Sequence, residues 1–277
     1  MKSVERFVRY ARNKFQLGKD SRVVAVLRPV YSLLLKLLYG RRGLPRLING
    51  QEAIRVLPSR RQIAETYEPA VFDYLKRAIR PGAVILDVGA NVGVFTILLA
   101  RWAGPEGHVY AFEPDPQTLH PLQEHLTLNG VKERVTALPL AVSDRTGPAT
   151  LYTNHHSTEN TLCSLCTKHP HFTGFRAVEV PLTTIDTFCA EHAIAPTLIK
   201  VDIEGFEIHA LRGARETMLR HRPIVVVEVH PMNWPAIGVG GEEIASIAAE
   251  TGYRLAAMEG QADSLSTLGH VLLEPIS

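Results

Sequence analysis

The chain has 277 residues, a net charge of +2 and 45% hydrophobic residues, values that describe a globular protein and exclude a disordered one. Its three cysteines are an odd number, which excludes a disulfide framework and favours a reducing compartment. Residues 1–20 lack the apolar core of a signal peptide, so we expect a cytoplasmic protein.

Positive charge is concentrated at the start of the chain. Residues 1–46 contain twelve Lys and Arg against two acids, and the remaining 231 residues contain eighteen against twenty-six. Val23–Tyr39 is rich in leucine and valine, but Arg28, Pro29 and Lys36 interrupt it. Its uninterrupted apolar runs are well short of the ~20 residues that cross a bilayer. The pattern instead predicts an amphipathic helix within a basic segment.

Two roles remain open for this basic segment. The helix can pack on the rest of the protein with its charges in solvent, or its leucine-rich face can lie in a membrane interface beside anionic headgroups. A nucleic-acid partner is not expected, because the aromatic residues that stack on single-stranded bases are sparse. We therefore predict a basic helical extension over residues 1–50 and a globular part over residues 51–277. Peripheral contact at the inner membrane face, through residues 1–46, is the alternative, and the oligomeric state is left open.

The globular part alternates apolar strands with helices from about Tyr67 onward. We predict strands at residues 83–88, 107–114, 134–144, 197–202 and 223–230. We predict helices at residues 68–79, 93–103, 116–130 and 207–221, and the runs 241–252 and 270–275 close the chain. Pro139 lies inside the third strand, which suits an edge position. This alternation predicts an α/β fold with a mostly parallel sheet and helices on both faces.

Polar side chains follow almost every predicted strand. They are Asp87, Glu113, Ser143, Asp144, Asp202, Glu204, Glu228 and His230. In parallel sheets a ligand lies at the carboxyl ends of the strands, so these residues share one edge. Any one of them alone is typical of a capping residue, but the whole set favours a binding site.

A glycine-rich turn follows the first predicted strand. Gly89–Gly93 reads G-x-N-x-G and lacks the third glycine of dinucleotide-binding turns. Glu113 follows Gly93 by twenty residues, where an acid accepts hydrogen bonds from both ribose hydroxyls. Asp87 precedes the turn, where a carboxylate repels a pyrophosphate and attracts an ammonium group. S-adenosylmethionine carries an ammonium and a sulfonium and no phosphate, so the sequence favours it over a nicotinamide cofactor.

Several segments resemble the FkbM-type family of S-adenosylmethionine-dependent methyltransferases, over roughly Tyr67–His230. These segments are VILDVGANVGVFTILLA, VYAFEPDPQTLHPLQEHLTLNG, LPLAVSD, TIDTF, LIKVDIEGFEIHALRGA and IVVVEVHP, of which IKVDIEGFE is the most specific part. The resemblance implies a class I methyltransferase, Rossmann-like sheet of seven strands, the last antiparallel, in a methyltransferase domain over residues 51–277. It also implies O-methylation, often of a sugar or other secondary-metabolite hydroxyl, and it leaves residues 1–50 unexplained.

The resemblance further implies which residues surround the cofactor. They are Glu68, Asp87, Gly89, Ala90, Asn91, Gly93, Thr96, Glu113, Ser143 and Asp144. The turn and Asp87 would surround the methionine part, Glu113 would hold the ribose, and Ser143 and Asp144 would lie beside the adenine. Thr96 would receive the cofactor's carboxylate together with backbone N–H groups at the helix start. Glu68 either contacts the cofactor or only stabilises the start of its helix.

Methyl transfer to a hydroxyl requires alignment of the two reactants and a base for the hydroxyl proton. The candidates at the next two strand ends are Lys200, Asp202, Glu204, Glu228 and His230. We predict that His230 or Asp202 is the base and that Glu204 and Glu228 orient the acceptor. Lys200 would pair with these acids or stabilise a developing alkoxide, and a purely structural salt bridge is the alternative.

Metal binding is an alternative that we do not favour, and we predict no metal site. Asp202, Glu228 and His230 have the ligand types of a divalent cation that orients a diol-like acceptor. The segment NHHSTENTLCSLCTKHPHF contains a C-x-x-C pair with nearby histidines, as zinc sites do. Only one such pair occurs, and the segment lies where FkbM-type sequences vary. We predict instead a variable substrate loop over residues 155–180, either a flap over the acceptor or a plain surface loop.

Two other functions compete with that of an O-methyltransferase. A nicotinamide-dependent oxidoreductase is opposed by the missing third glycine. A non-catalytic, membrane-associated scaffold of the same fold is opposed by the intact acids Asp87, Glu113 and Asp202. The acceptor itself stays open among sugars, lipid-linked glycans, polyketides and peptides.

Overall fold

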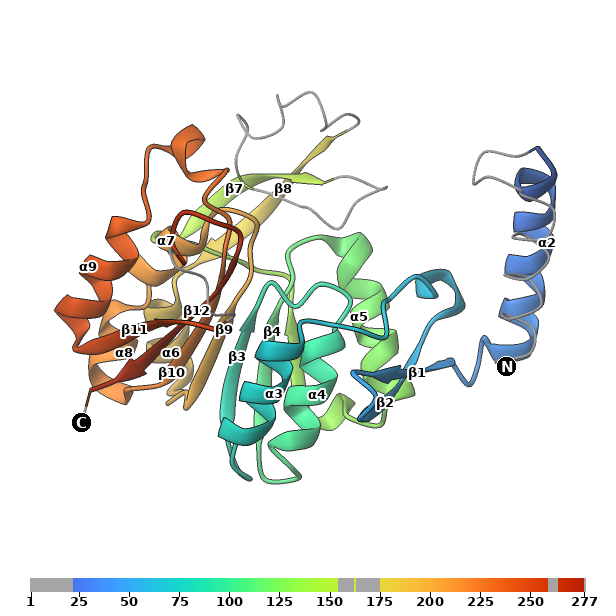
Figure 1. The fold of residues 1–277 in the computed structure, drawn as a ribbon, viewed down its shortest axis with the longest axis horizontal. Coiled ribbons are helices and arrows are strands. Elements are labelled where there is room, and N and C mark those ends of the chain that lie inside the picture. Colours follow the sequence, from blue (N-terminus) through green and yellow to red (C-terminus); the bar gives the residue numbers. More distant parts are fainter. Residues whose placement is uncertain (1–21, 154–161, 163–174, 259–263, 277) are drawn as a thin grey trace. The chain divides into compact units, whose positions relative to one another are not determined.

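The computed structural model describes residues 22–153, 162, 175–258 and 264–276. They form two compact units (Figure 1). The N-terminal unit consists of residues 22–46 and 55–63, and the main unit consists of residues 47–54 and the described residues from 64 onward. The predicted domain boundary at residue 50 stays a prediction, because compactness alone does not show which part folds independently.

Helix α2 (Arg22–Tyr39) is the principal element of the N-terminal unit and confirms the predicted helix. A short 3-10 helix, η1 (Pro58–Arg60), belongs to the same unit. Between them, β1 (Leu44–Ile48) and β2 (Glu52–Val56) pair as a two-stranded sheet that the sequence pattern did not predict. In the described part of the chain, no helix combines the length and the apolar character that a membrane crossing requires.

A seven-stranded sheet forms the centre of the main unit, in the order β11-β12-β10-β9-β3-β4-β5. The strands are β3 (Val84–Val88), β4 (His108–Phe112), β5 (Val135–Leu138), β9 (Leu198–Val201), β10 (Ile224–Val229), β11 (Tyr253–Ala257) and β12 (Gly269–Pro275). Only β12 runs antiparallel to its neighbours within this sheet. The predicted α/β class and the antiparallel last strand are confirmed.

Helices cover both faces of this sheet (Figure 1). They are α3 (Pro69–Ala78), α4 (Val94–Trp102), α5 (Pro116–Leu128), α6 (Ile185–His192), α7 (Glu207–Arg212), α8 (Arg215–His221) and α9 (Glu242–Thr251), with the 3-10 helices η2 (Lys132–Arg134) and η4 (Trp234–Ile237). Leu86 and Val88 of β3 pack in one core with Phe188 of α6 and Met218 of α8. Because strand side chains alternate between faces, Asp87 points to the opposite face.

Two predicted elements are wrong in their extent. The third strand ends at Leu138, because Pro139 has no N–H for the ladder. The chain continues into β6 (Ala141–Val142), which belongs to another sheet. β5 is the edge strand of the main sheet, as Pro139 indicated. The helix predicted over 207–221 is interrupted at Gly213, where an added Cβ atom would lie 2.3 Å from the carbonyl oxygen of Ser143.

A second sheet of the main unit was not foreseen. Its strands are β6, β7 (Gly147–Thr153) and β8 (Arg176–Thr183), in the order β6-β8-β7. β8 starts inside the predicted loop of residues 155–180, so that the loop is shorter than predicted at its carboxyl end. Its histidines and the pair Cys163 and Cys166 lie outside the described residues, and its predicted substrate role stays a prediction.

Candidate active site

The turn between β3 and α4 needs glycine at two positions. Gly89 has φ +84°, and a Cβ atom there would lie 1.8 Å from the carbonyl oxygen of Asp202 at the end of β9. Gly93 has φ +86°, and a Cβ atom there would lie 2.3 Å from Leu122 of α5. Neither the conformation nor the space suits another residue. The turn is therefore held tightly between β9 and α5, with its backbone close to the ends of the strands.

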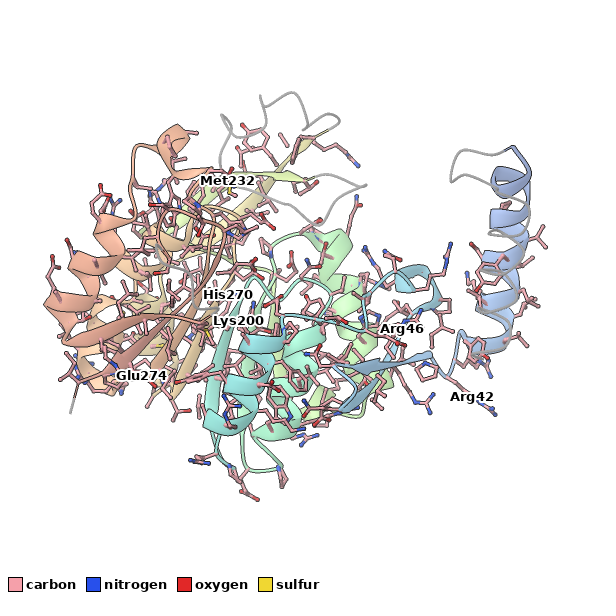
Figure 2. All side chains as sticks on the ribbon, viewed as in Figure 1. Arg42, Arg46, Lys200, Met232, His270 and Glu274 are labelled. Atoms are coloured by element: carbon pink, nitrogen blue, oxygen red, sulfur yellow. The ribbon has the colours of Figure 1, made fainter. Side chains whose placement is uncertain are left out.

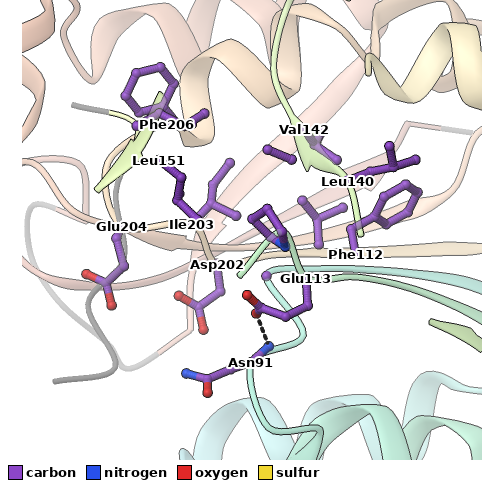
Figure 3. A pocket seen from close by; sticks show the side chains of 15 residues that line it. Asn91, Phe112, Glu113, Leu140, Val142, Leu151, Asp202, Ile203, Glu204 and Phe206 are labelled. Carbon is purple, nitrogen blue, oxygen red and sulfur yellow. Dashed lines mark hydrogen bonds between the residues drawn. The ribbon is translucent and has the colours of Figure 1, made fainter. Parts of the chain in front are cut away.

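Glu113 ends β4 and meets this turn. Its carboxylate accepts hydrogen bonds from the backbone N–H groups of Asn91, at 2.9 Å, and of Asp115, at 3.0 Å (Figure 3). Burial raises the pKa of Glu113 to about 8, although both N–H groups oppose this shift. Each carboxylate oxygen keeps a further lone pair, so that Glu113 can accept hydrogen bonds from two neighbouring hydroxyls of a ligand.

Asp87 lies in β3, one strand away. Its Oδ2 atom accepts a hydrogen bond from the Thr96 hydroxyl at 2.6 Å. Its Oδ1 atom is buried, and none of the described residues donates to it. Burial raises the pKa of Asp87, against the opposing effects of Lys200 and Thr96. A buried carboxylate oxygen without a donor is costly unless a ligand supplies one, which fits a ligand that carries an ammonium group.

Lys200 of β9 is opposite Asp87 in the strand register and is buried. Its Nζ atom donates to Asp202 at 3.1 Å and lies 5.1 Å from the centre of the Phe95 ring. Burial alone would lower the pKa of Lys200, but Asp202 and Glu68 raise it above its usual value. Burial alone would raise the pKa of Asp202, but Lys200 lowers it below its usual value. The two side chains therefore form a charged pair.

His270 brings a second imidazole to this edge. It stands opposite Glu228 in the β10–β12 register, and its Nε2 atom lies 3.7 Å from Glu228 and 3.1 Å from Glu68. Burial alone would lower the pKa of His270, but Glu228 and Glu68 raise it to about 10. Burial raises the pKa of Glu228. Lys200 and His270 thus occupy neighbouring parts of one polar cluster (Figure 2).

His230, directly after β10, is held between two carboxylates. Its Nδ1 atom lies 2.8 Å from Glu207 and its Nε2 atom lies 3.3 Å from Glu204. Glu207 is fully buried and also accepts hydrogen bonds from the Gly205 N–H, at 2.7 Å, and the Trp234 indole, at 3.1 Å. Burial alone would lower the pKa of His230, but Glu207 raises it to about 9. The imidazole is therefore fixed in orientation and is unusually basic.

A cleft joins the glycine turn to this acidic cluster (Figure 3). Its polar lining includes Asn91, Glu113, Asp202 and Glu204. The apolar lining was missed by the sequence predictions and consists of Val88, Phe112, Pro114, Leu140, Ala141, Val142, Leu151, Leu162, Ile203 and Phe206. In the sequence these apolar residues cannot be told from core residues. A cleft with one apolar and one polar end suits a ligand that has a flat ring and charged groups.

Seven of the ten predicted cofactor residues do not line the cleft: Glu68, Asp87, Ala90, Gly93, Thr96, Ser143 and Asp144. Thr96 is fully buried and its hydroxyl binds Asp87. Ala90 is buried, and its N–H donates to the carbonyl of Phe112 at 3.0 Å. The Ser143 hydroxyl is 3.3 Å from Asp144. Asp144 also lies 3.6 Å from an Arg212 guanidinium nitrogen. Direct contact of these seven residues with a cofactor stays a prediction. Leu140, Ala141 and Val142, just before Ser143, do line the cleft.

Two residues of the cluster were not predicted, Glu207 and His270. Glu207 is in the run IKVDIEGFE, but it starts helix α7, two residues beyond Gly205. The sequence predictions for the catalytic residues considered only strand ends, so its contact with His230 was not predicted. His270 starts β12, and the start of an antiparallel strand lies at the carboxyl edge of its parallel neighbours. The implied antiparallel last strand therefore contained the signal for His270, which was not used.

The five acids and histidines of the cluster also have the spacing of cation ligands. Ligand atoms of Asp202, Glu228 and His230 all lie within 4.8 Å of one another, and so do those of Glu68, Glu228 and His270. Such clusters are common without an ion. The prediction that no metal is bound stays a prediction.

The fold and the arrangement of the site together identify the structural class of the protein. The strand order with an antiparallel β12, the glycine turn after β3 and the acid at the end of β4 are those of Rossmann-like class I methyltransferases. The family model of the methyltransferase FkbM domain matches residues 87–255. The chain belongs to the FkbM methyltransferase family, as its sequence motifs indicated.

Relatives with assigned names are methyltransferases. The chain is 30% identical over 199 residues to the 31-O-demethyl-FK506 methyltransferase FkbM of Streptomyces tacrolimicus, covering 62% of this chain and 74% of that protein. It is 27% identical over 174 residues to the hexuronic acid methyltransferase AglP of Haloferax volcanii, covering 60% and 62%. The crystal structure of methyltransferase FkbM from Methylobacillus flagellatus has a TM-score of 0.44 and 19% identity, covering 73% of this chain but only 50% of that one.

Proposed function

We propose that this protein is an S-adenosylmethionine-dependent O-methyltransferase that acts on a hydroxyl of a sugar, glycan or secondary metabolite. The observation that carries the proposal is the excess of acids around the glycine turn and its neighbouring strand ends. These acids are Glu68, Asp87, Glu113, Asp202, Glu204, Glu207 and Glu228, against one lysine and two histidines. Such a site repels a pyrophosphate and attracts a ligand with an ammonium and a sulfonium.

The named relatives support the acceptor class. One is named for the 31-O-demethyl form of FK506 and the other for hexuronic acid. The first name describes a compound that lacks a methyl group on an oxygen, and the second describes a sugar acid. An acceptor of this kind offers a hydroxyl and further oxygens, which acids and imidazoles at a cleft edge hold by hydrogen bonds. We therefore assign a hydroxylated acceptor to this protein, without choosing among sugars and metabolites.

We assign the cofactor to the cleft through two carboxylates. Glu113 accepts from the ribose hydroxyls while its two backbone donors keep it in place. Asp87 lies behind the turn, where its buried Oδ1 atom has no donor among the described residues and would accept one from an ammonium group or from a water bound to it. The apolar lining at Phe112 and Leu140 suits an adenine ring. The bound cofactor supplies an activated methyl group on its sulfonium.

We assign the general base to His230, in preference to Asp202. Asp202 is paired with Lys200 and has a lowered pKa, so it is a weak proton acceptor. His230 has a raised pKa, and Glu207 holds its Nδ1 atom so that Nε2 is the proton-accepting atom. Glu204, 3.3 Å from Nε2, is in position to receive a hydrogen bond from the acceptor. Glu207 acts through His230 and is a positioning residue.

Calorimetric titration of the full chain tests the proposed function. S-adenosylmethionine and S-adenosylhomocysteine are expected to bind with and without Mg²⁺, and NAD(P)H is not. Binding of NAD(P)H without adenosyl ligands would support the oxidoreductase and overturn the proposal. Adenosyl binding without methyl transfer to the hydroxyl of any sugar, glycan or secondary metabolite supplied with it would support the non-catalytic scaffold. Dependence of turnover on Mg²⁺, abolished by EDTA, would support a cation at Asp202, Glu228 and His230.

A further inference from the structure

Helix α2 has an apolar face that the described residues of its own unit leave exposed. We call it the leucine stripe; its residues are Val30, Leu33, Leu34, Leu37 and Leu38. Their spacing of three and four places them on one side of the helix. All five are exposed, from 45% for Leu34 to 74% for Leu37. Single exposed leucines are normal, but a contiguous row of them indicates an interaction surface.

The other side of α2 is already used inside the N-terminal unit. Leu35 is buried, with 4% exposure. The Arg61 guanidinium, next to η1, lies over the Tyr31 ring at 5.8 Å from its centre. Leu35 lies away from the centre of the leucine stripe, and Tyr31 lies at its border, three and seven residues before Leu34 and Leu38. The helix therefore packs along Leu35 and Tyr31, and among the described residues of its unit none covers the leucine stripe.

The positive charge around the leucine stripe limits the kind of partner that can bind it. Residues 22–46 and 55–63 contain nine Lys and Arg and no Asp or Glu. Among them Lys36, Arg41 and Arg42 are exposed close to the carboxyl end of α2, and Figure 2 labels Arg42. A partner must therefore be apolar where it meets the leucines and anionic where it meets the cations. A second copy of this unit has the same charge and is repelled.

We propose that the N-terminal unit docks on the surface of an anionic lipid bilayer. The leucine stripe enters the acyl boundary, and the surrounding Lys and Arg meet the headgroups. Nucleic acid is the weaker alternative, because it gives five exposed aliphatic side chains nothing to bind. The aromatic residues of the described part of this unit are Tyr31 and Tyr39, too few for a platform of stacked bases. Docking is independent of the proposed enzymatic activity, so each can fail without the other.

Co-sedimentation of the full chain with vesicles tests this docking. We expect binding to vesicles of phosphatidylcholine mixed with phosphatidylglycerol and little binding to phosphatidylcholine alone. Leu33→Gln and Leu37→Gln are each expected to weaken partitioning about tenfold, because each removes one buried leucine side chain. Leu219→Gln is the matched control, since Leu219 is 50% exposed on α8 of the main unit, and it is expected to bind like the wild type. Circular dichroism at matched concentration checks that all variants are folded.

Other outcomes overturn the proposal. Undiminished vesicle binding by both stripe variants would mean that charge alone carries the association. Absence of binding to anionic vesicles by the folded wild type would exclude the membrane. A dimer that dissociates in the Leu37→Gln variant would assign the leucine stripe to a second copy. Tighter binding to an oligonucleotide than to anionic vesicles, at the same salt concentration, would assign the basic surface to nucleic acid.

Discussion

The Nδ1 atom of His230 lies 2.8 Å from a carboxylate oxygen of Glu207, which is itself fully buried and bound by two further donors. The pair fixes the imidazole so that Nδ1 carries a proton and Nε2 is the nitrogen that gains or loses one. The groups that face the ring are Glu207, Glu204, Glu228 and Asp202. With four carboxylates around it, His230 is an imidazolium at neutral pH when the site is empty.

The pH dependence of the methyl-transfer rate follows from this pair. A base must be deprotonated to act, so kcat/KM of the wild type is expected to rise with pH up to about 9, the pKa of His230. In Glu207→Gln the imidazole loses its main stabilising charge, so the rise is expected at a pH at least one unit lower. The plateau is also expected to be lower, because a less basic imidazole accepts the proton less well. Initial rates measured from pH 6 to 10 check both shifts.

The matched control for this series is Glu216→Gln, an exposed acid in the first turn of α8. Its profile is expected to coincide with that of the wild type. A profile of Glu207→Gln that keeps its inflection and only loses amplitude would show that Glu207 is merely structural. A His230→Asn variant with more than a tenth of the wild-type kcat would move the base assignment to Asp202.

Cofactor affinity is expected to depend on the two acceptor oxygens of Glu113. Glu113→Gln keeps the size of the side chain but replaces one acceptor oxygen with an NH₂ group, which cannot accept a hydrogen bond from a ribose hydroxyl. We expect S-adenosylhomocysteine to bind about 10- to 100-fold more weakly, the equivalent of ~1.5–3 kcal/mol. Isothermal titration calorimetry measures this loss, and Glu106→Gln, on an exposed loop, is the control. Unchanged affinity in the Glu113 variant would contradict the assignment of the cleft to an adenosyl ligand.

Much of the site could be predicted from the sequence, because many of its residues lie at the carboxyl ends of parallel strands. An alternating pattern of strands and helices predicts a parallel sheet, and the carboxyl ends of parallel strands meet at one edge. The residues placed at that edge for this reason are Asp87, Glu113, Asp202 and Glu228. Glu207 and His270 escaped prediction, since one is on a helix and the other on an antiparallel strand, and both reach the edge only through tertiary packing.

The errors in the fold have equally local causes. The predicted third strand was one apolar run in the sequence, but Pro139 divides it between two sheets. The helix predicted over 207–221 was periodic throughout, but contact of Gly213 with the backbone of Ser143 divides it. Hydrophobic periodicity in a sequence indicates which residues are buried. The breaks at Pro139 and Gly213 depend instead on which other segments the buried residues contact.

The glycine turn makes a prediction about stability as well as binding. Gly89→Ala would place a methyl group 1.8 Å from a backbone oxygen in a φ of +84°. Gly82→Ala has the same strained conformation, at φ +83°, but no atom within 4 Å of the new methyl group. We expect Gly82→Ala to cost about 1–2 kcal/mol from conformation alone and Gly89→Ala at least ~4 kcal/mol, because a backbone clash is added. Urea denaturation of both variants measures the difference, and equal costs would contradict the tight packing of the turn.

Stability is also expected to fall as the pH becomes alkaline, through His270. Its pKa is raised to about 10 in the folded state, against ~6.5 in an unfolded chain. A raised folded pKa contributes stability that is complete below about 6.5 and is lost as the pH rises through the folded value. His270→Gln is therefore expected to be less stable than the wild type by about 3 kcal/mol at pH 7, since it leaves Glu68 and Glu228 without their cation.

The quantity to follow is the difference in unfolding free energy between the wild type and His270→Gln, because His230 and the other groups titrate in both proteins. It is expected to shrink as the pH rises from about 6.5 to about 10, where folded His270 still holds a proton that the unfolded chain has lost, and to be smallest above pH 10, where the ion pairs with Glu68 and Glu228 have disappeared. Urea midpoints at several pH values measure it, with His120→Gln as the control, since the His120 side chain is 73% exposed. A difference that stays constant over this range would show that His270 stabilises the sheet by packing and not by its charge.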